Sequence, residues 1–245
     1  MYKFEKPLQE GKVIKRNSQF TMDVLLNGEI IRCHCPTTGR IGDIELHNIA
    51  CLLSKSNDSK RKLSYTVEAV SCDEWDNKEK NWIGINQVLS NKLVEYFLQT
   101  HQLDKMISQY KQIKREVTLG KSKLDFLVGN TYLEVKTPLT TLHVAYGNHV
   151  KTKPFSPFSS TERFAKHIEE LTSSLAEHER AILLTVHQYE ITLQKPHYKS
   201  THYDEISHVV HRAIEKGLEI WNADMKFTPI GVKILSLDNT TYSMK

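Results

Sequence analysis

The sequence has no long apolar stretch. No run of apolar residues approaches the roughly 20 needed to span a membrane, which argues against a membrane-spanning helix. The first twelve residues, MYKFEKPLQEGK, lack the apolar centre of a secretory signal peptide. We therefore expect a cytoplasmic protein with no membrane partner.

Cysteine is also scarce. The four cysteines are Cys33, Cys35, Cys51 and Cys72, all in the first third of the chain. A cytosolic chain of this size needs no disulfides. The Cys33-His34-Cys35 spacing differs from the C-x2-C of a zinc site, and no second pair completes it. The sequence predicts neither a disulfide framework nor structural zinc.

The bulk composition is that of an ordinary globular protein. The 245 residues include 39% hydrophobic and 25% charged side chains and can form one large domain or two small ones. The net charge of +4 permits binding to nucleic acid but does not require it.

Residues 1–84 are expected to form a first domain made only of β-strands. Short β-prone segments separated by turn residues predict about five strands, at 11–16, 20–26, 29–35, 49–54 and 63–70. Asn27-Gly28 marks a tight hairpin turn between the second and the third. Five short strands without a strong helix favour an OB-like β-barrel.

Such barrels often bind nucleic acid through basic and aromatic side chains. The candidates here are Arg16, Tyr65 and the basic run Lys60-Arg61-Lys62, which lies in a connection between strands. The alternative is that Tyr65 belongs to the barrel core and that the lysines are simply solvated.

Residues 85–245 are expected to form a second domain that mixes helices and strands. Apolar spacing predicts helices at 86–102 and 203–216, and the capping box Ser159–Glu162 starts another. Strands are expected at 113–119, 180–188 and 229–237, and a long loop at 138–158. Together these elements predict a mixed sheet flanked by helices.

The stretch from Ser122 to Thr137 reads as a hairpin around Gly129-Asn130. That turn sets a register in which Asp125 lies opposite Glu134. Alternation places Leu124, Phe126, Val128, Leu133 and Val135 on a buried face, and Lys123, Asp125, Glu134 and Lys136 on the other.

Two opposed carboxylates repel unless water, a proton or a cation lies between them. A hard divalent ion such as Mg²⁺ or Mn²⁺ accepts such oxygens, with the carbonyl of Val135 as a further ligand. Lys136 can then orient or activate a water for metal-assisted phosphodiester hydrolysis. The alternative is an exposed strand face with mixed charges.

The order of elements supports the first interpretation. Three antiparallel strands followed by a helical crossover match the core of restriction-endonuclease-like folds. In those folds the PD-(D/E)xK site resembles Asp125, Glu134 and Lys136 of this hairpin.

Several segments together resemble the sugar fermentation stimulation protein (SfsA-like) family. They are His34–Gly39, Lys60–Thr66, Ile83–Asn86 with Asn91, Arg115–Val117, Ser122–Leu127, Leu133–Lys136, and Thr161-x-Arg163-x-x-Lys166-His167. The resemblance spans nearly the whole chain in the right order. It implies an OB-like domain, a nuclease-like domain, DNA binding and a role in regulating sugar (maltose) metabolism genes.

The resemblance also assigns site residues. The nuclease-like core maps to Asp125, Glu134 and Lys136, and the further family positions Glu116, Arg163, Lys166 and His167 lie near it. The chain departs from the family at Thr37, at Phe164 and in the loop from Thr140 to Ser159, which lacks the expected Phe-Pro-Asp.

Three hypotheses follow from these observations. The first is a metal-dependent nuclease, the second a DNA-binding regulator that does not cleave, and the third a globular protein that acts through another partner. The sequence does not decide whether the nucleic acid is DNA or RNA, or whether it is single- or double-stranded. It also leaves the oligomeric state open, and a homodimer is one option.

Overall fold

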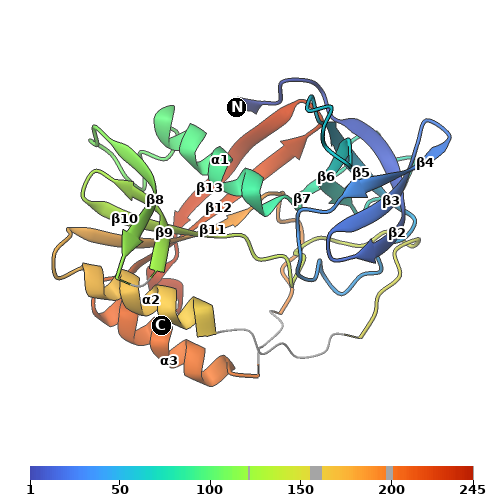
Figure 1. The fold of residues 1–245 in the computed structure, drawn as a ribbon. Coiled ribbons are helices and arrows are strands. Elements are labelled where there is room, and N and C mark those ends of the chain that lie inside the picture. Colours follow the sequence, from blue (N-terminus) through green and yellow to red (C-terminus); the bar gives the residue numbers. More distant parts are fainter. Residues whose placement is uncertain (121, 155–161, 197–200, 245) are drawn as a thin grey trace.

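The computed structural model describes residues 1–120, 122–154, 162–196 and 201–244. Two sheets organise the chain, a barrel and a larger mixed sheet that carries the helices (Figure 1). In those ranges no helix has the length and apolar character needed to cross a membrane.

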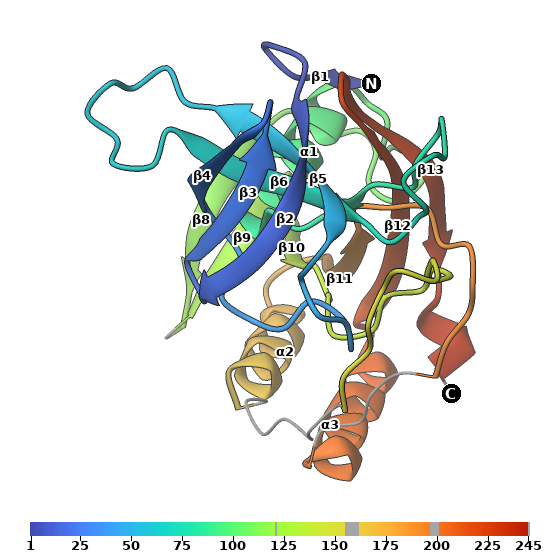
Figure 2. The same ribbon diagram turned by 90° about the vertical axis from the view of Figure 1, so that its right-hand side faces the viewer.

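The barrel is built from short antiparallel strands in the order β4-β3-β2-β5-β6-β7, and β4 also pairs with β6. Figure 2 looks onto these strands. They are β2 (Gln9–Ser18), β3 (Thr21–Leu26), β4 (Glu29–His34), β5 (Ile49–Lys55), β6 (Tyr65–Ser71) and β7 (Ile83–Gly84). Asn27 and Gly28 have φ of 51° and 88°, the positive values that a tight hairpin turn requires. The predicted OB-like barrel is confirmed.

Later parts of the chain complete the barrel core. Leu139, Leu142, Val144 and Tyr189 share one buried cluster with barrel residues such as Val24. The barrel interior is therefore filled from both halves of the sequence.

The second sheet has seven strands in the order β1-β13-β12-β11-β10-β9-β8. They are β1 (Tyr2–Lys3), β8 (Ile113–Leu119), β9 (Ser122–Val128), β10 (Thr131–Lys136), β11 (Arg180–His187), β12 (Glu219–Thr228) and β13 (Gly231–Asn239). β11 is parallel to both β10 and β12, and the remaining neighbours are antiparallel. The predicted mixed sheet is confirmed.

Two features of this sheet differ from the sequence expectation. Residues 2–3 pair with β13 and not with the barrel. A strand at 219–228, β12, pairs with the expected final strand. From Trp221 onward the side chains of β12 alternate between buried and partly buried, the period of a strand, and all five polar residues of β12 lie at partly buried positions.

Helices cover both faces of the sheet (Figure 1). α1 (Gln87–Gln99) contributes to a cluster that includes sheet residues such as Phe126 and barrel residues such as Leu52. α2 (Glu162–Ser174) and α3 (Tyr203–Glu215) pack on the other face around Ile168 and Leu183. Gly217, at φ +107°, follows α3 as predicted. A short 3₁₀ turn, η1 (Thr241–Met244), ends the described chain.

The starts of two helices bear on the site. Asn86 caps α1, because its side-chain oxygen accepts from the N–H groups of Val88 and Leu89. Its amide donates to Glu68 of β6, 2.7 Å away, so the barrel holds the start of this helix. The capping box predicted at Ser159–Glu162 lies outside the described residues except for Glu162, where α2 begins.

Candidate active site

A pocket of about 410 Å³ lies where β9, β10, α1 and α2 meet. Its lining combines two carboxylates with basic and amide side chains: Gln87, Asn91, Asp125, Glu134, Val135, Lys136, Thr137, Arg163 and Phe164. The sequence-predicted core of Asp125, Glu134 and Lys136 is thus gathered in one place.

The hairpin turn sets the register as expected, but the ladder ends early. Gly129 has a φ of +57°, and the last pair before the site is Phe126 with Leu133. Beyond that pair the N–H of Val135 donates to Asp125 Oδ2 at 2.8 Å, and the N–H of Asp125 donates to Glu134 Oε2 at 3.4 Å. The acids therefore bond to the main chain of the opposite strand instead of facing each other as a ladder pair.

The side-chain alternation of β9 also resets at this point. Leu124 is buried with the α2–α3 cluster, whereas Phe126 is buried with the α1 cluster. The expectation that both lie on one face is wrong. The partner strand β8 is irregular at the same level, because Glu116 has a φ of 52° between the pairs Arg115–Phe126 and Val117–Leu124.

Glu134 is the most buried member of the site, with 2% of its surface exposed. Its Oε1 accepts from Lys136 Nζ at 2.5 Å and from His167 Nδ1 at 2.6 Å. Because a carboxylate oxygen only accepts, the proton of this contact is on His167 Nδ1. Two donors on one oxygen hold the buried carboxylate in a fixed orientation.

Asp125 has a different environment. Asn91 of α1 donates to its Oδ1 at 2.7 Å. Burial and, next, the negative charge of Glu134 raise the pKa of Asp125, and the Val135 N–H opposes the shift. A group that binds at this position and carries positive charge would relieve the same repulsion.

The remaining candidates of this half separate into two groups. Arg163 lies on the pocket lining, and His167 contacts Glu134. Lys166 is exposed on α2. Glu116 points into solvent, where it pairs with Lys123 at 2.5 Å, and this contact lowers the pKa of Glu116. Neither Lys166 nor Glu116 is among the described residues that line the pocket.

Two matches to family models cover most of the chain. Residues 14–85 match the "SfsA N-terminal OB domain", and residues 88–231 match the "Sugar fermentation stimulation protein RE domain". The chain belongs to the sugar fermentation stimulation protein family.

Individual members of the family agree along the whole length. The sugar fermentation stimulation protein homolog of Acaryochloris marina is 31% identical, over 94% of this chain and 92% of that protein. The homolog of Nostoc sp. is 32% identical over 94% of each. A solved structure described as Pyrococcus furiosus SfsA in complex with Ca²⁺ shares the fold, with a TM-score of 0.73, 20% identity and 97% of each chain covered.

The site also contains residues that chemistry-based inspection of the sequence did not select. Asn91 entered only through the resemblance to the family, Thr137 only as the end of the hairpin stretch, and Gln87 was not named at all. Asn91 and Gln87 lie one turn apart on α1 and face the pocket together. Their spacing of four residues on a predicted helix is the one signal that the sequence offers for them.

The barrel candidates lie outside this pocket and do not act as one group. The guanidinium of Arg16 donates to the carbonyls of Ser18, Gln19, Thr37 and Gly39. Arg61 donates to Thr66 at 3.0 Å, while Lys60 and Lys62 are exposed. Tyr65 is partly buried against the barrel core, with the ammonium of Lys55 5.7 Å from its ring centre.

Within the described ranges, no group of three or more His, Cys, Asp and Glu side chains is arranged to hold a metal ion.

Proposed function

We propose that this protein binds nucleic acid, DNA in the first place, and hydrolyses phosphodiester bonds with a divalent cation held by Asp125 and Glu134. The observation that carries this proposal is the shared pocket. Two carboxylates, Lys136 and Arg163 line the same 410 Å³ cavity, and burial and, next, the charge of the neighbouring acid raise the pKa of Asp125.

The donor set fits a hard cation of the Mg²⁺ or Mn²⁺ type. Such ions often take only one or two protein carboxylates and complete their coordination with water and substrate phosphate. Asp125 and Glu134 supply the carboxylates, and Val135 lines the same pocket and offers a main-chain oxygen. A related archaeal protein is described in complex with Ca²⁺, another cation that prefers oxygen ligands.

Each polar residue then has a chemical task. A bound divalent cation would stabilise the charge that develops on the phosphate and lower the pKa of its water. Lys136, tied to Glu134, positions the attacking water. Arg163 reaches the phosphate from the start of α2, and arginine suits phosphate oxygens because its donors form a planar fork.

Two residues position the acids without touching substrate. His167 fixes Glu134 from α2, and Asn91 fixes Asp125 from α1. The two carboxylates are thus oriented by helices on opposite faces of the sheet.

A second candidate function is DNA binding without cleavage, in the regulation of sugar (maltose) metabolism genes. One observation favours it. All four carboxylate oxygens of Asp125 and Glu134 already accept a hydrogen bond from the protein. A cation must displace or share these donors, and a site that keeps them would bind substrate without hydrolysing it. The names of the curated relatives also refer to sugar fermentation.

The experiment that separates the two is a Mg²⁺ and Mn²⁺ titration of the wild type, Glu134→Gln and Glu215→Gln. Binding and cleavage are scored together on labelled single- and double-stranded DNA and RNA. Glu215 is an exposed acid at the end of α3 and serves as the matched control.

Metal-dependent cleavage that disappears only in Glu134→Gln, with binding retained, supports hydrolysis at this site. Binding by the wild type without cleavage of any substrate supports the regulator. A wild type that binds none of the four substrates contradicts both proposals.

A further inference from the structure

A cleft of about 590 Å³ opens on the barrel, separate from the acidic pocket. Four of its lining residues are apolar and form the floor: Ile14, Ile41, Ile44 and Leu46. The polar lining carries four cations and a single carboxylate: Lys15, Arg16, Arg40, Lys153, His47 and Glu45. An excess of positive charge around a concave surface attracts polyanions.

One wall of the cleft is fixed by Arg16. Its guanidinium donates to the carbonyls of Thr37 and Gly39 at 2.5 and 2.9 Å, which holds the loop that carries Arg40 against β2. The ring of His47 donates from Nδ1 to the carbonyl of Ile14, 2.6 Å away. These contacts make the wall rigid before any ligand arrives, which lowers the entropic cost of binding.

The facing wall comes from the long connection between β10 and α2. Thr152 forms a β-bridge with Ile44, and the N–H of Lys153 donates to the carbonyl of Asp43 at 2.7 Å. These two contacts fix the main chain at Thr152 and Lys153, from which the Lys153 side chain extends.

The two exposed lysines of the cleft keep their charge available. Neither Lys15 nor Lys153 forms a salt bridge with a described residue. Arg16, in contrast, uses its donors on main-chain carbonyls, so its side chain holds the cleft wall.

The same connection links the cleft to the candidate active site. It leaves the acidic pocket at Thr137, lines the barrel cleft at Lys153 and returns to the pocket at Arg163. Figure 1 shows its first part crossing from the sheet to the barrel. Ten residue steps separate Lys153 from Arg163, so their Cα atoms lie at most about 36 Å apart.

We propose that the barrel cleft is a second anchor for the phosphate backbone of a nucleic acid whose reacting phosphodiester lies at Asp125 and Glu134. This inference rests on the proposed function, because it gives a binding place to the part of the same substrate that is distant from the reacting phosphodiester. A duplex rises 3.4 Å per base pair, so about ten base pairs cover the greatest separation that the chain allows. Duplexes longer than this are long enough to reach both places, and a duplex shorter than the actual separation engages only the acidic pocket.

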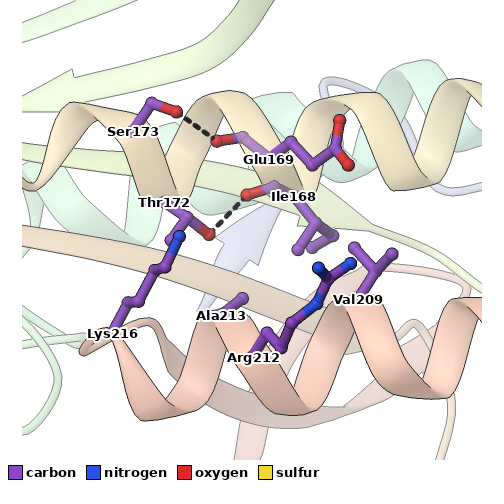
Figure 3. Close-up of a pocket in the computed structure, with 8 residues that line it drawn as sticks. All are labelled: Ile168, Glu169, Thr172, Ser173, Val209, Arg212, Ala213 and Lys216. Carbon is purple, nitrogen blue, oxygen red and sulfur yellow. Dashed lines mark hydrogen bonds between the residues drawn. The ribbon is translucent and has the colours of Figure 1, made fainter.

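Another groove, between α2 and α3, also carries cations but is a weaker candidate (Figure 3). Arg212 and Lys216 line it together with Glu169. The hydroxyls of Thr172 and Ser173 donate to carbonyls of their own helix at 2.7 and 2.9 Å, so they are not available as donors to a phosphate.

The test compares Lys15→Ala/Lys153→Ala with Lys3→Ala/Lys233→Ala. The control pair removes the same charge from exposed lysines on the β1–β13 edge of the sheet. Affinity is measured for hairpin duplexes of six and of thirty base pairs at several salt concentrations, with melting temperature as a check on folding.

We expect the cleft variant to bind the long duplex about tenfold more weakly and to lower the slope of log Kd against log salt by about two phosphate equivalents. Its affinity for the short duplex and both affinities of the control pair should stay at the wild-type level. The cleft proposal is overturned if the variant binds the long duplex like the wild type, or loses both duplexes equally.

The third pair of variants, Lys60→Ala/Lys62→Ala, tests the rival surface on the barrel. A length-dependent loss in that pair and not in the cleft variant also overturns the proposal. In each of these outcomes the wild type still binds, so nucleic-acid binding stands, and cleavage is decided by the separate metal titration. A wild type that binds neither duplex, and none of the single strands of the metal titration, contradicts the proposed function itself.

Discussion

Asp125 and Glu134 are adjacent acids, yet the structure treats them differently. Glu134 is almost fully buried and receives two basic side chains on one oxygen. Asp125 receives an amide and a main-chain N–H, both of them neutral donors. Cationic partners compensate a buried charge better than neutral donors do, so Asp125 is the acid whose ionisation costs the folded state more.

This difference predicts that Asp125→Asn stabilises the protein. The folded-state pKa of Asp125 is raised, so the native state binds more protons than the unfolded state between the two pKa values. Wild-type stability attributable to Asp125 therefore falls as the pH rises from the unfolded value, about 3.9, through the folded value. Denaturant unfolding at several pH values measures the free energy of unfolding of both proteins. The value for the variant minus that for the wild type should increase across this pH window and stay positive at neutral pH.

The exposed Asp76→Asn variant is the control and should show no comparable change. An advantage of Asp125→Asn that shrinks with rising pH contradicts the argument.

A divalent cation should stabilise the wild type relative to Asp125→Asn, which is the opposite of the order expected without metal. A ligand that binds only the native state stabilises it by RT ln(1 + [L]/Kd), about 1.4 kcal/mol at ten times Kd. Added Mg²⁺ or Mn²⁺ should therefore raise the melting temperature of the wild type and leave Asp125→Asn unchanged. Equal shifts in both proteins would place the cation elsewhere. This measurement does not depend on catalytic turnover.

The cysteines make a third prediction at this scale. All four are buried with free thiols, and burial raises the pKa of Cys33 to about 11 and that of Cys72 to about 12. Because the thiolate is the reactive form, a thiol reagent at neutral pH should label the protein only as fast as it opens. Stoichiometric labelling of the native protein within seconds would contradict the buried placement.

At the scale of single elements, the two hairpin turns show what local sequence can predict. The two turns set their registers through the positive φ of Asn27, Gly28 and Gly129, which glycine adopts freely and asparagine more readily than most residues. The reset of β9 at Asp125 could not be predicted, because it goes with a positive φ at Glu116, a residue type that rarely adopts one. The contacts of Asn91 and His167 were also out of reach, since they depend on how two distant helices dock.

The barrel turn can be tested with a matched pair of glycines. Gly28→Ala forces an L-residue into a φ of +88°, although a Cβ there meets no atom within 4 Å. We expect it to cost about 1 kcal/mol of unfolding free energy. Gly39→Ala also meets no atom and has no positive φ, so its effect should lie between neutral and slightly stabilising. Denaturant melts of the two variants check this, and equal costs would rule out the backbone explanation.

At the scale of the whole molecule, the two sheets are not independent units. The long connection after β10 fills the barrel core, Trp82 bridges to Phe227 of β12, and the N–H of Gly84 donates to the carbonyl of Gln188. The sequence predicted the loop at 138–158 but not its burial, because its apolar residues follow no regular period. Its packing is decided by the barrel surface that it covers.

This shared core predicts a single unfolding transition that a mutation in the loop can shift as a whole. Leu142 belongs to the connection but lies 1% exposed in the barrel cluster. Leu142→Ala should cost about 2–5 kcal/mol and lower the melting temperature by roughly 2–4 °C per kcal/mol. Calorimetry should give equal calorimetric and van't Hoff enthalpies for both the wild type and the variant. Leu193→Ala, at a side chain that is 46% exposed, is the control and should change little.

If Leu142→Ala instead splits the melt into an early barrel transition and an unshifted later one, then the sheets unfold separately. In that case the barrel cleft and the acidic pocket could not be held at a fixed spacing by the connection between them.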